Sequence, residues 1–116
     1  MPPSLADRVR HILEAIRQIQ AALSGVDYKQ FEGDLLLRLA MERLLEIVCE
    51  ASKYIPPDIK AGEPDVAWRK VTDFGNRLRH AYHSIDAAIV WQIANEDLEP
   101  LKRLVERIIR DAGERP

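Results

Sequence analysis

One short segment, residues 68–83, holds most of the side chains with which this chain can do chemistry. It reads WRKVTDFGNRLRHAYH and carries four Lys and Arg residues against one acidic residue, a net charge of +3, whereas the whole chain carries −2. Its His80 is a side chain that can take up or release a proton near neutral pH. Its arginines present planar cations that suit a phosphate. The segment therefore combines acid–base groups with anion-binding groups.

A helical arrangement divides this segment into an apolar and a polar side, at about 100° per residue. The apolar side consists of Trp68, Val71, Phe74, Leu78 and Tyr82, with Gly75 among them. The polar side consists of Arg69, Asp73, Asn76 and His80, flanked by Arg77 and His83. We therefore expect His80 to point away from the core. A merely solvated face gives the same pattern, so spacing alone leaves both interpretations open.

The elements that must position this segment are also helices. Apolar residues recur at spacings of three and four, and no stretch alternates with period two for long enough to form a strand. Capping patterns and breakers predict five helices, over residues 4–24, 27–54, 65–83, 87–94 and 97–112, with a loop near 55–64. Asp97 is the expected N-cap of the last helix. The fold class is all-α, a compact antiparallel bundle forming one domain over residues 1–116.

Composition excludes several classes of protein. A chain of 116 residues buries one core, and 5 Gly and 7 Pro with 47% hydrophobic residues are typical of a globular protein rather than a disordered one. The N-terminus lacks a signal-peptide pattern, and no stretch of ~18 apolar residues could span a membrane, so a cytoplasmic protein is expected. The single cysteine, Cys49, excludes an intrachain disulfide and is expected in the core.

No metal or cofactor is expected from the sequence. The acidic residues of the second predicted helix and its start make only a weak metal constellation, which we interpret as a solvated or partner-facing edge. They are Glu32, Asp34, Glu42, Glu46 and Glu50.

The order of these features resembles the HepT-like branch of the HEPN-domain proteins. The resemblance rests on Trp68-Arg69, on Asn76-Arg77-Leu78-Arg79-His80-Ala81-Tyr82, on Ile85-Asp86, on Val90-Trp91-Gln92-Ile93, and on Asp97-Leu98 with Leu101-Lys102. It covers essentially the whole chain and is specific in combination, while each piece alone is weak. It implies a dimeric helical-bundle toxin that cleaves RNA without a metal ion, with tRNA as one candidate substrate.

The resemblance also implies a partner and site residues. The partner is an MNT-domain nucleotidyltransferase antitoxin, which in this family adds AMP to a tyrosine that matches Tyr82. The family's catalytic histidine matches His80, and the polar residue that follows its arginine matches Asn76. The arginine itself has no match, because Gly75 stands where it is usually found and the other permitted positions are Asp73 and Phe74.

Three arginines are candidates to replace the missing one. Arg77 and Arg79 lie close to His80 in sequence, and Arg69 shares its helix face. The expected catalytic residues are thus His80, Asn76, Arg77 and Arg79, and the expected RNA-binding residues are Arg69, Lys70, Arg77, Arg79 and His83.

RNA cleavage without a metal needs a base for the 2′-OH, an acid for the leaving oxygen and a cation for the phosphate. A two-fold dimer would supply two His80 side chains to one cleft. Its interface candidates are the second predicted helix, which Leu37 and Leu45 make apolar on more than one side, and the helix that bears His80. The alternative is a non-catalytic HEPN module that binds RNA or the nucleotidyltransferase. A third hypothesis is a helical adaptor unrelated to RNA.

Overall fold

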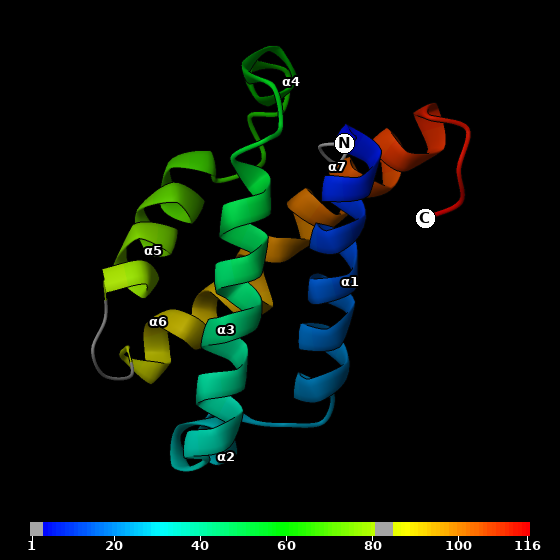
Figure 1. Ribbon diagram of the computed structural model, residues 1–116. Helices are drawn as coiled ribbons and strands as arrows, with labels where there is room; N and C mark the ends of the chain where they lie inside the picture. Colours follow the sequence, from blue (N-terminus) through cyan, green and yellow to red (C-terminus); the bar gives the residue numbers. More distant parts are fainter. Residues whose placement is uncertain (1–3, 81–84) are drawn as a thin grey trace.

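Three helices side by side form the main layer of the molecule. The computed structural model describes residues 4–80 and 85–116, and none of these residues lies in a strand. Helix α1 (Leu5–Leu23) packs against α3 (Leu35–Ser52), and α5 (Trp68–His80) packs against α3 on its other side (Figure 1). The prediction of an all-α bundle is confirmed.

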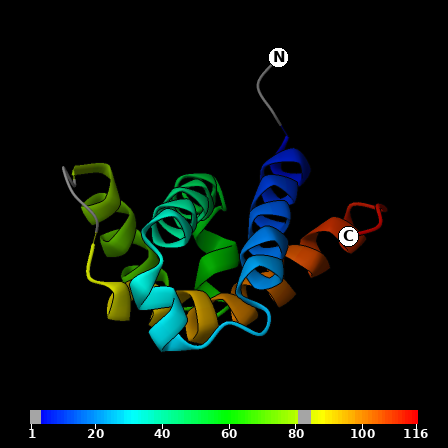
Figure 2. The same ribbon diagram turned by 90° about the horizontal axis from the view of Figure 1, so that it is seen from below.

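A second layer crosses behind these three helices. It consists of α6 (Ala87–Gln92), the π-helical turn η1 (Ile93–Asp97) and α7 (Leu98–Asp111), which follow one another along one side of the row (Figure 2). The core lies between the layers, where Ile12 and Ile16 of α1 and Leu101 and Val105 of α7 have 0% of their surface exposed. In the described residues, no helix is both long and apolar enough to cross a membrane.

Helix α1 follows its sequence pattern closely. The Ser4 hydroxyl accepts a hydrogen bond from the Asp7 backbone N–H, and the Asp7 carboxylate accepts one from the Ser4 N–H, each at 3.1 Å. This reciprocal capping satisfies donors that the first helical turn would otherwise leave free. The helix ends before Gly25, whose φ of 75° suits a residue without a side chain.

The prediction of one continuous helix over residues 27–54 is wrong. It is divided at Asp34 into α2 (Tyr28–Gly33) and α3. Asp34 leaves the helical conformation, and its carboxylate accepts a hydrogen bond from the Leu37 backbone N–H at 3.0 Å. An aspartate can cap a new helix in this way instead of continuing the old one.

This break changes which leucines enter the core. Leu35, Leu36 and Leu39 belong to the apolar pattern of the single predicted helix, but their surfaces are 51%, 79% and 43% exposed. Met41, Leu45, Val48 and Cys49 form the buried side of α3 instead. The first turns of α3 therefore present an uncovered apolar surface, which we call the leucine patch and define as Leu35, Leu36 and Leu39.

The boundaries after α3 also differ from the prediction. The expected loop contains a short helix, α4 (Pro57–Ala61), with Pro57 at its first position. Helix α5 begins at Trp68 and not at Asp65, because buried Val66 lies in the turn before it and its carbonyl accepts the Trp68 N–H at 2.9 Å. The predicted end of this helix near His83 lies outside the described residues.

The expected break before the last helix is absent, and Asp97 is not its cap. The chain stays helical from α6 through η1 into α7, and Asp97 has helical dihedrals with no capping hydrogen bond. Pro100 has no N–H, and its ring would clash with the carbonyl four residues earlier, at Glu96. The π turn ends at Asp97, next to Glu96. Such turns occur where the regular backbone hydrogen bonds of an α-helix are interrupted.

A close contact between α3 and α5 sets the position of the segment that bears His80. A Cβ built on Gly75 would lie 2.7 Å from the Cβ of Cys49, a distance that real side chains do not tolerate. Cys49 is in the core as predicted, and burial raises the pKa of its thiol to about 12. The thiol is therefore an unreactive packing group, and glycine at position 75 is a requirement of helix packing.

This contact predicts that alanine at position 75 changes the stability of the protein in the direction opposite to its usual effect in a helix. Alanine in place of a mid-helix glycine normally stabilises a protein by about 0.5–1 kcal/mol. Gly75→Ala should instead destabilise this chain by about 1–3 kcal/mol, because α5 must move off α3. Chemical denaturation measures the effect, and alkylation of Cys49 should become faster as the two helices separate.

Two variants complete this test. Gly33→Ala is the control, since Gly33 also lies in a helix but a Cβ at its position would meet nothing within 4 Å, and it should be neutral or stabilising. Cys49→Gly removes the clashing Cβ, so it should cancel most of the extra loss when combined with Gly75→Ala. Equal behaviour of Gly75→Ala and Gly33→Ala would contradict the proposed contact.

Candidate functional site

The outward face of α5 carries the polar side chains that the sequence singles out. Asn76, Arg77 and His80 are exposed, and so are Arg69 and Asp73 to differing degrees. Val71, Phe74 and Gly75 are buried on the opposite side against α3 and the core. The expectation that His80 points away from the core is confirmed.

His80 stands in the last turn of α5 without a partner among the described residues. In residues 4–80 and 85–116, the α5 side chains that make hydrogen bonds or ion pairs are Trp68, Lys70 and Arg79. Asn76 and Asp73, its polar neighbours on this side of α5, make no such contact with His80 there. Within the described residues, the His80 imidazole is exposed and is not engaged by another side chain.

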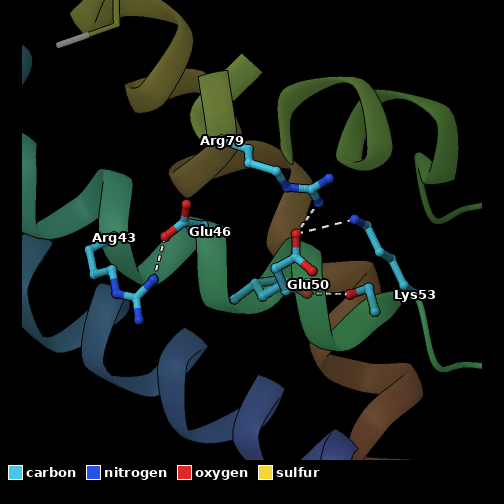
Figure 3. A network of polar contacts seen from close by, with 7 residues as sticks. Arg43, Glu46, Glu50, Lys53 and Arg79 are labelled. Atoms are coloured by element: carbon cyan, nitrogen blue, oxygen red, sulfur yellow. Dashed lines mark hydrogen bonds and ion pairs between the residues drawn. The ribbon is translucent and has the colours of Figure 1, made fainter. Parts of the chain in front are cut away.

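Arg79 is held by α3. Its guanidinium donates to the Glu50 carboxylate, which also receives Lys53 Nζ at 3.1 Å (Figure 3). Hydrogen bonds from Arg79 and then Lys53 lower the pKa of Glu50, so the carboxylate stays charged. Because both partners are partly exposed, the pair adds little stability, but it directs Arg79 toward α3.

An open groove of about 660 Å³ runs between α5 and the α6–η1 segment. Its lining includes Arg69, Lys70 and Arg77, three of the residues expected to bind RNA. Lys70 does not offer a free charge, since its Nζ lies 2.8 Å from the carboxylate of Asp97. The structure thus brings Arg69 and Arg77 to one groove and places Arg79 elsewhere.

The sequence did not predict which residues several side chains of this region contact. Glu50 holds Arg79 although 29 residues separate them, and Asp97 pairs with Lys70 across two elements. Ile89 and Gln92 line the groove from the second layer. Only a knowledge of which helices pack together could have predicted these contacts, because each of them joins elements that are distant in sequence.

The acidic residues of α3 are engaged separately rather than as a cluster. Glu46 pairs with Arg43, and Glu50 with Arg79 and Lys53 (Figure 3). Glu42 is half-buried, and burial raises the pKa of its carboxyl. No group of three or more His, Cys, Asp or Glu side chains suited to a metal occurs in the part of the chain that the structure describes. Tyr82 and His83, the expected modification site and RNA contact, lie outside the described residues.

Comparison with known proteins places this arrangement in a family. Residues 12–108 match the family described as "Ribonuclease HepT-like". A protein of Thermococcus cleftensis named probable ribonuclease HepT is 34% identical over 93% of this chain and 98% of its own length. A protein of Methanocaldococcus jannaschii named as a putative RNase is 36% identical over 82% of this chain and 87% of its own.

No solved structure matches the chain. The family match nevertheless includes all of α5, the groove and the core that positions them, and both relatives align along most of their length. The helical bundle, the exposed His80 and these similarities agree, and the chain belongs to the HepT-like ribonuclease family.

Proposed function

We propose that this chain is an endoribonuclease that cleaves RNA without a metal ion, with His80 as its acid–base group. The observation that carries the proposal is the exposure of Asn76, Arg77 and His80 close together at the end of α5, in a member of a ribonuclease family. Histidine supplies proton transfer near neutral pH, and arginine supplies a fixed cation for a phosphate.

The chemistry follows from these groups. A neutral His80 takes the proton of a ribose 2′-OH, and the freed O2′ attacks the adjacent phosphorus. The bond from phosphorus to the 5′ oxygen breaks, and that oxygen takes a proton from an acid. The products are one RNA fragment that ends in a 2′,3′-cyclic phosphate and one that begins with a 5′-hydroxyl. Arg77 stabilises the negative charge that gathers on the phosphate oxygens during the attack.

The need for both a base and an acid supports a dimer. One copy contributes a single His80, so two copies related by a two-fold axis would place two imidazoles at one cleft. The leucine patch supports such an association, because an exposed apolar surface on α3 is of the kind that a second copy covers. The helix that bears His80 is the other candidate contact.

Among the three arginines, Arg77 fits the role of the missing family cation best. Arg79 is held by Glu50, and Arg69 lies eight residues before Arg77 on α5. Arg77 is three residues before His80 on the helix, or about 4.5 Å along its axis. Its guanidinium can therefore reach a phosphate that the imidazole also contacts.

The resemblance extends the proposal to regulation. We propose that the chain acts in the cytoplasm as the toxin of a pair, with tRNA as one candidate substrate. The partner is an MNT-domain nucleotidyltransferase that transfers AMP from ATP to Tyr82. The tyrosine oxygen loses its proton and bonds to the α-phosphorus of ATP, and pyrophosphate leaves. Tyr82 follows His80 by two residues, so an added phosphate would bring negative charge close to the site and repel RNA.

A second candidate function is a non-catalytic module that binds RNA or the nucleotidyltransferase. The observation in its favour is Gly75, where the family arginine is missing and where the contact with Cys49 leaves no room for a side chain. Binding without cleavage would distinguish this function from the first.

The first prediction from the proposed function concerns His80. Purified protein with chelator should cut tRNA at discrete positions, and His80→Ala should lower the rate by at least about 10²-fold, because acid–base catalysis contributes 10²–10⁴. The matched control is His11→Ala, an exposed histidine on α1 that should leave the rate unchanged. Absence of cutting by protein free of AMP, with RNA still bound, would favour the non-catalytic module.

The second prediction separates the arginines. Arg77→Ala should lower the cleavage rate by about 10²-fold, since it removes a donor to the developing charge. Arg79→Ala should have a much smaller effect, because this side chain is directed to Glu50. Single-turnover rates measure both, and unimpaired cleavage by the two variants would show that neither arginine replaces the missing cation.

The third prediction concerns modification. Co-expression with an MNT-domain nucleotidyltransferase should raise the intact mass by one or more AMP units and abolish cleavage. Tyr82→Phe should remove this mass shift, whereas Tyr54→Phe, at an exposed tyrosine elsewhere, should not. A shift that persists in Tyr82→Phe would place the modification on another residue.

A further inference from the structure

The groove between α5 and α6–η1 combines an apolar floor with a charged rim. Phe74 and Ile93 are 3% and 4% exposed and close the bottom, and Ile89 forms part of one wall. Trp68 lines the other end, where its indole N–H donates to the Glu63 carbonyl at 3.2 Å, which fixes the ring. The volume of about 660 Å³ lies within the range of sites that enclose small organic groups.

The charges of the rim are arranged along one line. Arg69, Asp73 and Arg77 follow at intervals of four residues on α5, so the two arginines lie about 12 Å apart along the axis with the carboxylate between them. Lys70 adds no free charge because Asp97 neutralises it at 2.8 Å. This order favours anionic groups at the two ends and a group with hydrogen-bond donors at the middle.

We propose that this groove binds one unpaired nucleotide of the RNA, an inference that rests on the ribonuclease function proposed above. The flanking phosphates lie on Arg69 and Arg77, and the base lies on the apolar floor between them. Asp73 accepts a hydrogen bond from an amino group of the base, and the Gln92 amide can donate to or accept from its edge.

Base pairing decides which RNA this groove accepts. In a duplex the base faces are stacked and the major groove is deep and narrow, so a base cannot enter an apolar floor without being unpaired first. Single-stranded loops and ends present bases freely, and stacking on apolar and aromatic side chains then stabilises the complex. The groove therefore selects unpaired RNA.

The groove also adjoins the proposed reaction centre. Arg77 lines it, and His80 lies three residues further along the same face of α5. A nucleotide held in the groove would thus neighbour the phosphate at which His80 acts, and Arg77 would contact the phosphate they share. The identity of that nucleotide would influence where the RNA is cut.

The two tryptophans offer a direct measurement. Trp91 packs against Tyr28 and Phe31 at ring distances of 5.8 and 5.2 Å, away from the groove lining, so Trp91→Phe leaves Trp68 as the reporter. In the His80→Ala background, which prevents cutting, a short single-stranded oligoribonucleotide should quench Trp68 emission. The same strand annealed into a duplex should bind at least about tenfold more weakly.

Binding variants locate the nucleotide. Fluorescence anisotropy with a labelled single strand, in protein that keeps both tryptophans, should show about tenfold weaker binding for Ile89→Glu. Arg69→Ala should weaken binding and lower the slope of log affinity against log salt by about 0.7. The matched control, Arg17→Ala, removes the same charge from an exposed position on α1 and should leave affinity unchanged.

The outcomes separate this inference from the function on which it rests. Equal affinity of Ile89→Glu, Arg69→Ala and unaltered protein, with His80-dependent cutting intact, would overturn the groove assignment alone. Loss of a dimer in Ile89→Glu by sedimentation, with RNA affinity unchanged, would assign the groove to a second copy. Neither binding nor cutting of any RNA would overturn both. Because Arg69 is not in the core, Arg69→Ala decides the question even if Ile89→Glu fails to fold.

Discussion

The contact of α5 with α3 at Gly75 and Cys49 is the constraint on which the rest of the site depends. Two helices can approach this closely only where one lacks a side chain, and the 2.7 Å separation from a hypothetical Cβ leaves no alternative to glycine. Once α5 is held there, its apolar side is committed to the core. Its polar side, with Asn76, Arg77 and His80, must then face outward.

This placement also determines what each cation of α5 can do. Arg79 comes within reach of Glu50 on α3, and Lys70 within reach of Asp97 at the end of η1. Arg69 and Arg77 remain for the groove. The net charge of +3 that the sequence concentrates in residues 68–83 is thus larger than the charge a ligand meets, because two of the four cations are already paired within the protein.

Local sequence patterns predicted the structure correctly where interactions between residues close in sequence determine it. The start of α1 at Ser4 follows from a capping pattern, and the outward direction of His80 follows from helical spacing. The sequence patterns gave wrong predictions where contacts between distant elements, or a side chain that caps a new helix, determine the structure. Asp34 starts a new helix and so exposes Leu36, whereas Asp97, an apparent cap, stays helical because the chain continues through a π turn and its carboxylate pairs with Lys70.

In the proposed site the cation stands at position 77 instead of position 75, and side chains at these two positions of α5 point in different directions. Two residues turn a side chain by about 200° around the helix, so an arginine at 75 would project toward α3 while Arg77 projects outward with the groove. What stabilises a cleaving phosphate is a guanidinium at the right point in space, whichever residue carries it. In the proposed site, Gly75 and Arg77 therefore act together. The glycine lets α5 pack closely against α3, and Arg77 supplies the positive charge on the side of α5 that does not pack against α3.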